Sequence, residues 1–154
     1  MADRATGRGS SDGINRPVLD KAAADIKKAL QLNPDVFPGH LDLSQIYIMQ
    51  GRPQDALVEI EREPYDSARE FMYGIAYYGL GREKDSDAAL NMLIAKYSAN
   101  SPYQIAQVYA FRNQPNEAFK WLDRAYAQRN VALIGMNVDP LLKSLHNDPR
   151  YAAL

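Results

Sequence analysis

A short pattern of large, small and aromatic residues recurs three times along this chain and constrains its fold more than any other feature. The three copies are Leu43-Ser44-x-x-Tyr47, Tyr73-Gly74-x-x-Tyr77 and Ile105-Ala106-x-x-Tyr109, with tyrosines separated by 30 and 32 residues. A turn residue (Gly51, Gly81 or Asn113) and a second small residue (Ala56, Ser86 or Ala118) follow at fixed offsets. Small residues allow two helices to approach closely, and the large residues fill the gap to the next pair. The sequence therefore predicts stacked helix pairs.

Helical spacing of apolar residues continues from Pro17 to the end, and short segments with Pro, Gly or Asn interrupt it. We expect helices near residues 17–32, 38–50, 53–63, 67–80, 84–97, 101–112, 115–128, 140–146 and 149–154. Ser67 and Ser101 each begin a sequence that fits a capping box, and Asp139 and Asp148 each precede a proline as N-caps. Because every linker is short, successive helices must fold back as antiparallel neighbours.

The pattern resembles the tetratricopeptide repeat, which spans about 34 residues with small, aromatic and proline positions at fixed places. The resemblance covers roughly residues 20–130, and the first segment fits the second half of a repeat through Ala22, Ile26, Ala29 and Pro34. The place of the family's tryptophan holds His40, Glu70 and Pro102. The resemblance implies an all-α, right-handed α-solenoid of antiparallel helix pairs. It would contain about three repeats, an N-terminal half repeat and a C-terminal capping segment within a single domain, residues 17–154.

The C-terminal stretch is similar to the repeat regions of bacterial multidomain regulatory proteins. The similarity lies in residues 116–126, in Asp139-Pro140-Leu141-Leu142 and in Asp148-Pro149-Arg150-Tyr151. In those proteins such repeats follow a nucleotide cyclase, a kinase or a winged-helix DNA-binding domain. The similarity suggests ancestry in regulatory scaffolds and implies no activity of its own.

Charge and composition exclude several classes of partner. The 154 residues carry 18 Lys and Arg against 19 Asp and Glu, so the chain lacks the excess of basic residues typical of nucleic-acid or membrane-surface binders. There is no cysteine for disulfides or thiolate chemistry. Residues 1–16 hold no apolar core of signal-peptide length and are expected to form a flexible tail. We therefore expect a soluble, cytoplasmic protein.

The candidate chemical groups do not combine into a catalytic or metal site. Only two histidines are present; we expect His40 to be partly packed and His146 to lie at the surface or at a helix end. The alternating acids Glu59, Glu61 and Glu63 are expected on a solvated helix face. No nucleophile, zinc or phosphate-loop motif is found. We predict no enzymatic activity, no cofactor and no metal.

The first helices of the pairs carry a set of nearly uncharged side chains that, in the resembled family, face a concave groove. These residues are Leu41, Gln45, Ile48, Met49, Phe71, Ile75, Tyr78, Tyr103, Gln107 and Phe111. Tyr47, Tyr77 and Tyr109 are instead expected to pack inside the repeats. The first hypothesis is a non-catalytic module that binds an apolar peptide or helix of another protein. The alternatives are a self-association or structural module and a regulatory subunit of a separately encoded cyclase or transcription regulator.

The two ends of the array are expected to differ. On helix 17–32, one side (Val18, Ala22, Ile26 and Ala29) should pack on the next helix, and the other (Leu19, Ala23 and Leu30) should lack a cover. This predicts a homodimer through that helix. At the other end, Leu141, Leu142, Leu145, Tyr151 and Leu154 are expected to form a lid over Trp121 and Leu122.

Overall fold

The protein is all-helical throughout the part described by the computed structural model, residues 15–154, which contains no strand. The α-helices are α1 (Arg16–Leu32), α2 (Gly39–Met49), α3 (Pro53–Ile60), α4 (Asp66–Gly79), α5 (Glu83–Tyr97), α6 (Pro102–Phe111) and α7 (Pro115–Ala127). Three 3₁₀ helices follow: η1 (Val131–Val138), η2 (Pro140–Leu145) and η3 (Tyr151–Ala153). The predicted all-α class is confirmed. Residues 1–14 of the expected flexible tail lie outside the described residues.

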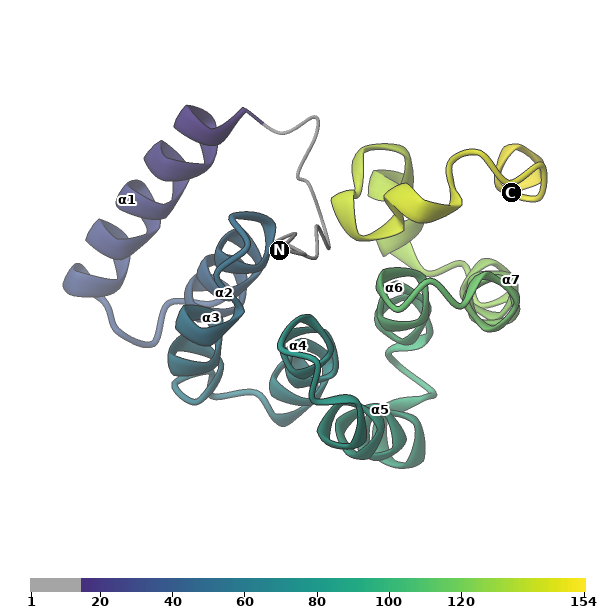
Figure 1. The fold of residues 1–154 in the computed structure, drawn as a ribbon, viewed down its shortest axis with the longest axis horizontal. Helices are drawn as coiled ribbons and strands as arrows, with labels where there is room; N and C mark the ends of the chain where they lie inside the picture. Colours follow the sequence, from purple (N-terminus) through teal and green to yellow (C-terminus); the bar gives the residue numbers. More distant parts are fainter. Residues whose placement is uncertain (1–14) are drawn as a thin grey trace, which may run out of the picture.

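The helices pack in adjacent pairs that follow one another along an arc. The pairs are α2 with α3, α4 with α5, and α6 with α7. Figure 1 shows α1 at one end of the arc and the 3₁₀ segment at the other, with α5 and α7 on the outer side. The helices α2, α4 and α6 also contact one another in sequence order. The side of these three helices that faces away from their pair partners is called the inner face below.

The same hydrogen-bonded turn closes the first helix of every pair. Gly51 and Gly81 have φ of 70° and 73°, and Asn113 adopts the same left-handed conformation with φ of 56°. The amide of the following residue reaches back to the carbonyl of Tyr47, Tyr77 or Tyr109 at 2.8–2.9 Å. This is the Schellman arrangement, which favours glycine or asparagine at the left-handed position. The sequence repeat is thus accompanied by a repeat in backbone geometry.

Small residues hold the helices of a pair close together, as the sequence predicts. All six small positions of the repeat are buried: Ser44, Ala56, Gly74, Ser86, Ala106 and Ala118. Ser86 Oγ donates to the Gly74 carbonyl at 2.5 Å and so links α5 to α4. A Cβ on Gly74 would lie 3.2 Å from Val108 Cγ1 on α6, a tight contact. Gly74 therefore sets the approach of the next pair as well as its own.

The expected helix caps form only in part. Asp139 Oδ1 accepts from the Leu141 amide at 2.9 Å, which confirms its predicted cap at the start of η2. Asp148 Oδ1 accepts from the Arg150 amide at 3.0 Å in the turn before η3, but the N-cap of η3 is Arg150, so the predicted Asp148 cap is wrong. The Ser67 box is wrong, because α4 begins at Asp66 after Tyr65 as N-cap. Ser101 is the N-cap of α6, but its side chain makes no capping hydrogen bond, so that box is wrong too.

The core forms two clusters joined through partly buried residues such as Tyr109 and Trp121. One runs from Leu19 on α1 through α2–α6 and includes Leu141. The second joins α6 and α7 to the 3₁₀ segment and includes Leu122, Leu142, Leu145 and Tyr151, with Trp121 and Leu154 packed against it. The predicted C-terminal lid is therefore present.

The expected orientation of α1 is wrong in part: Ala22 and Ile26 pack against the core as predicted, but other positions do not follow the prediction. Leu19 and Ala23, predicted to lack a cover, are only 7% and 6% exposed and belong to the core. Val18, predicted to pack inward, is 60% exposed, and Ala29 is exposed as well. The helix is rotated about its axis relative to the expectation, because Leu19 and Ala23 join the core cluster that also contains residues of α2.

Candidate functional site

On the inner face, α2 keeps a half-buried, uncharged stripe. Leu41, Gln45 and Met49 follow one another at intervals of four residues, so they share one side of the helix. Leu43 and Tyr47 lie on the opposite side and are buried between the pairs. These three side chains were predicted as groove residues, and the structure brings them together at the solvent boundary. Ile48, between them, is buried.

The corresponding positions on α4 and α6 are covered. Phe71 and Ile75 are buried in the core cluster that also contains Leu141 of η2. On α6, Tyr103 and Gln107 are buried as well. These four predicted groove residues are therefore core residues in the structure, and a ligand could not contact them without displacing the chain's own segments.

Asp139 holds the C-terminal segment on α6. Its Oδ2 accepts hydrogen bonds from Tyr103 Oη and from Gln107 Nε2, both at 2.7 Å. Ser144 Oγ of η2 donates to the Ala110 carbonyl at 2.8 Å, a second contact on the same helix. Burial, together with the hydrogen bond to Asp139, raises the pKa of the Tyr103 hydroxyl far above its usual value, so this donor stays protonated.

Two further predicted residues meet where α4 and α6 end. The rings of Tyr78 and Phe111 lie edge to face with centroids 6.2 Å apart, and both are half-buried. Tyr78 Oη donates to the Arg112 carbonyl at 3.4 Å, and the Arg112 guanidinium lies 5.6 Å from the Tyr78 ring. Arg112 Nη2 also contacts Asp87 Oδ1 at 2.5 Å. The aromatic pair is thus fixed by neighbours on two helix pairs.

No family model, no curated protein and no solved structure matches the chain. Within residues 15–154, no helix is long and apolar enough to cross a bilayer, and no three metal-ligating side chains gather in one place.

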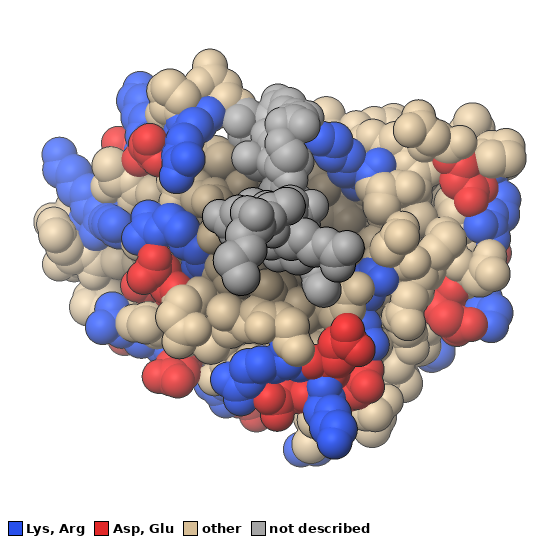
Figure 2. Space-filling view, in the orientation of Figure 1, with Lys and Arg blue, Asp and Glu red and all other residues tan. Residues whose placement is uncertain are grey.

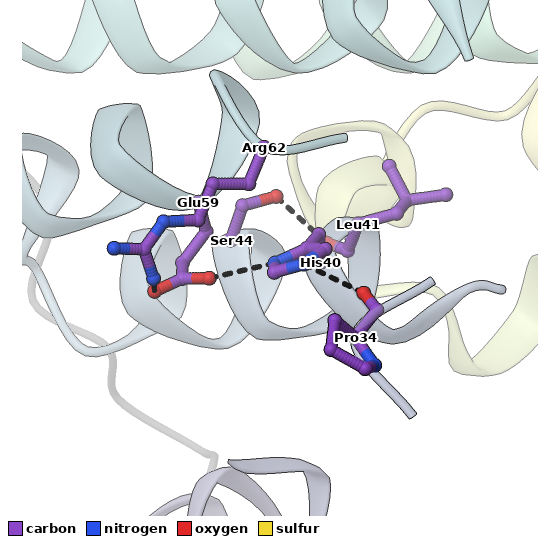
Figure 3. Close-up of polar contacts among 6 residues, drawn as sticks. All are labelled: Pro34, His40, Leu41, Ser44, Glu59 and Arg62. Carbon is purple, nitrogen blue, oxygen red and sulfur yellow. Dashed lines mark hydrogen bonds and ion pairs between the residues drawn. The ribbon is translucent and has the colours of Figure 1, made fainter. Parts of the chain in front are cut away.

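His40 is the centre of a polar cluster between α2, α3 and the α1–α2 loop (Figure 3). Its Nδ1 lies 2.8 Å from Glu59 Oε2, and its Nε2 lies 3.1 Å from the Pro34 carbonyl oxygen. Both neighbours are acceptors, so the two contacts require protons on both ring nitrogens or a proton on the Glu59 carboxyl group. Neither nitrogen is free to accept a proton from a substrate. The expected packing of His40 is confirmed, with a polar role in tying the loop to α3.

The expected solvated acidic face on α3 is wrong in two of its three residues. Glu61 is exposed, but Glu59 and Glu63 are buried. Glu63 Oε1 accepts from the Tyr65 amide at 3.2 Å, and its backbone carbonyl accepts from Arg69 Nη1 at 2.7 Å. These contacts arrange the α3–α4 connection, where the helix ends at Ile60 instead of residue 63 as expected.

A pocket of about 640 Å³ lies beside the His40 cluster. Its lining includes Lys27 and Gln31 of α1, Asp35 of the loop, and Arg62 of α3. Arg62 Nη1 is 3.6 Å from Glu59 Oε1, so the buried carboxylate faces a cation as well as the histidine. Within this wall, Glu59 therefore contacts both His40 and Arg62, and these contacts join α2 to α3 beside the pocket.

The C-terminal segment contains features that the sequence interpretation missed. Residues 131–138 form a 3₁₀ helix that no periodicity indicated, and Val131, Ile134 and Val138 project from it into solvent. The role of Asp139 as a bridge to α6 was also missed, because only its capping position is visible in the sequence. His146 is exposed at the end of η2, which confirms the expected surface position.

Proposed function

We propose that this chain is a non-catalytic protein-interaction module, a helical repeat array of the tetratricopeptide type that works in the cytoplasm. Its binding surface would be the inner face at α2, extended by the half-buried pair Tyr78 and Phe111. The ligand would be a peptide or helix of a partner protein, with no nucleic acid, membrane, metal or cofactor involved. The three repeated turns and the buried small positions support the assignment to this type of array.

The observation that carries the proposal is the difference between α2 and α6 on the inner face. At α6, Tyr103 and Gln107 receive the chain's own η2 segment. At α2, the stripe of Leu41, Gln45 and Met49 is half-buried only. The inner face thus already packs against a chain segment at one place and leaves a similar surface open at another. Uncharged and Met-containing surfaces of this kind are typical of interface cores.

The same geometry indicates the chemistry of the ligand. The α2 stripe offers apolar contacts and one side-chain amide, and it contains no charge to hold a terminal carboxylate. We therefore expect an apolar or aromatic segment to bind, with a dissociation constant that changes less than about threefold between low and high salt. A strong salt dependence would contradict this ligand class.

Matched variants test the surface. Gln45→Arg with Met49→Lys places charge on the inner face, while Gln54→Arg with Met92→Lys makes the same chemical changes at exposed positions of α3 and α5. Partners that co-purify with the wild-type chain would be identified by mass spectrometry and then titrated with all three proteins. We expect the inner pair to weaken binding at least about tenfold, corresponding to roughly 1.4 kcal/mol, and the outer pair to bind like the wild type.

Equal binding by the inner pair and the wild type would refute the proposal, provided that circular dichroism shows both folded. Phe71→Ala is a poor test of binding, because Phe71 is buried and its truncation would damage the core first. A regulatory subunit of a cyclase or transcription regulator remains a narrower form of the same proposal, which the identity of the captured partner would decide.

A further inference from the structure

The end of the array opposite α1 presents an apolar surface to solvent. Val131, Ile134 and Val138 of η1 are 76%, 88% and 85% exposed, and Tyr126 at the end of α7 is 63% exposed. We call these four residues the η1 patch. A pocket of about 770 Å³ lies beside them, lined by Tyr126, Val131 and Ile134 together with Leu133, Met136 and Leu154. We propose that the η1 patch is the interface of a two-fold symmetric dimer of this chain.

The area of the patch is close to the minimum that a specific dimer interface needs. Four side chains at these exposures leave on the order of 500 Å² of apolar surface in water, within the range of the largest apolar patch on a typical monomer. Two patches facing each other would bury about 1,000 Å² in total, which a specific interface must reach. The predicted dimer is therefore one of moderate affinity, in equilibrium with the monomer.

The charge of the patch favours a second copy of the chain as its occupant. A two-fold axis places like residues near like residues, so a charged patch would repel itself. Residues 130–138 contain no charged side chain, and Arg129 is the one charged side chain in the described lining of the pocket. In Figure 2 the region over the C-terminal segment is largely tan, while Lys and Arg are prominent over α1 at the other end.

The patch combines a projecting side chain with a neighbouring hollow. Ile134 is among the most exposed large apolar side chains and borders the pocket, so a projection and a hollow lie on one surface. In a two-fold interface the projection of each copy can enter the hollow of the other, and both contacts form at once. Gly135, beside Ile134, has no heavy atom within 4 Å of where a Cβ would lie, so the surroundings leave space for a partner.

The η1 patch is a better dimer surface than helix α1. Leu19 and Ala23, which made α1 a candidate, are buried. The exposed face of α1 carries charged residues in both signs: Asp20, Lys21, Asp25, Lys27 and Lys28. Val18 and Leu32 are exposed on α1, near opposite ends of the helix, and provide matched controls.

Sedimentation velocity of the full chain over a range from low to high micromolar concentration tests the proposal. The wild type should show a monomer–dimer equilibrium. Ile134→Glu with Val138→Glu should raise the dissociation constant at least about 100-fold, because a two-fold axis brings the four introduced charges together. The matched pair Leu32→Glu with Val18→Glu should change it less than about threefold. All four substituted positions are exposed within one copy of the chain, so circular dichroism and thermal unfolding of both variants should match the wild type.

A spin label gives the geometry. The chain has no cysteine, so Asn137→Cys carries a single label per copy, and Gln31→Cys on α1 is the control. We expect one short inter-label distance at residue 137 and a much longer one, or none, at residue 31. A wild type that stays monomeric at high micromolar concentration would overturn the proposal. A dimer that survives the η1 substitutions, or that the α1 substitutions disrupt equally, would overturn it as well.

Discussion

Replacement of Asp139 by alanine tests how the C-terminal segment is held on the array. Asp139 Oδ1 caps η2 through the Leu141 amide, and its Oδ2 accepts from Tyr103 and Gln107, both buried. Alanine removes all three hydrogen bonds that the carboxylate accepts, and its methyl group cannot accept any in their place. The buried hydroxyl and amide donors then have no partner unless water enters beside them.

The expected loss follows from these contacts. Hydrogen bonds to a charged group each contribute about 1.5–3 kcal/mol, and a lost N-cap costs about 1 kcal/mol. Asp139 is half-buried, so water can reach part of the vacated space and the terms do not add fully. We expect Asp139→Ala to lower the free energy of unfolding by about 3–4 kcal/mol. In a domain of this size that corresponds to a fall in Tm of roughly 10 °C.

Urea unfolding, followed by the fluorescence of Trp121, measures the effect. A double-mutant cycle of Asp139→Ala with Tyr103→Phe should give a coupling energy of about 1.5–2.5 kcal/mol. Asp123→Ala, at an exposed position of α7, should change stability by less than about 0.5 kcal/mol. A loss below about 1 kcal/mol for Asp139→Ala, or a coupling energy near zero, would refute the reasoning that this carboxylate holds the segment.

Three further outcomes are expected. Gly74→Leu should cost about 1–3 kcal/mol of stability, because its side chain would press into the next helix pair; thermal unfolding measures this. His40→Phe should cost about 2–4 kcal/mol, and Glu59→Leu in the same chain should restore part of that loss, because it removes the buried carboxylate that has lost its histidine partner. Hydrogen bonds from Arg150 lower the pKa of Asp148 to about 2, so its stabilising contribution is complete above about pH 4 and disappears toward pH 2. Urea unfolding curves of the wild type and Asp148→Asn should therefore converge as pH falls toward 2.

The paired helices could be predicted because close packing leaves few alternatives. Gly74 is an example: a side chain there would press on Val108, so a small residue at this position indicates that two helices approach closely. The left-handed turn residues Gly51, Gly81 and Asn113 are equally local signals. Helix starts were less predictable. Ser67 fits a capping box by sequence, yet α4 begins at Asp66, where Arg69 reaches back to the Glu63 carbonyl.

The candidate site could be predicted only at positions that no later segment of the chain covers. The α2 stripe depends on local periodicity, and Leu41, Gln45 and Met49 lie where the repeat places them. Tyr103 and Gln107 have the same pattern but are covered by a segment more than 30 residues later in the sequence. The spacing of residues within one helix does not indicate a contact with a segment so far away in the sequence. The burial of Glu59 has a similar cause, since its partner His40 lies 19 residues earlier.

The two ends of the array differ in how much apolar surface they expose, and the C-terminal lid does not remove that surface at its own end. The C-terminal lid buries Leu141, Leu142 and Leu145, but the same segment turns Val131 and Ile134 toward water. At the other end a single helix covers the core and presents a charged outer face. An array with apolar surfaces at both ends could join copies head to tail into filaments. With one apolar end and one charged end, the proposed association through the η1 patch would stop at a closed dimer and would leave the inner face of α2 free for the proposed partner.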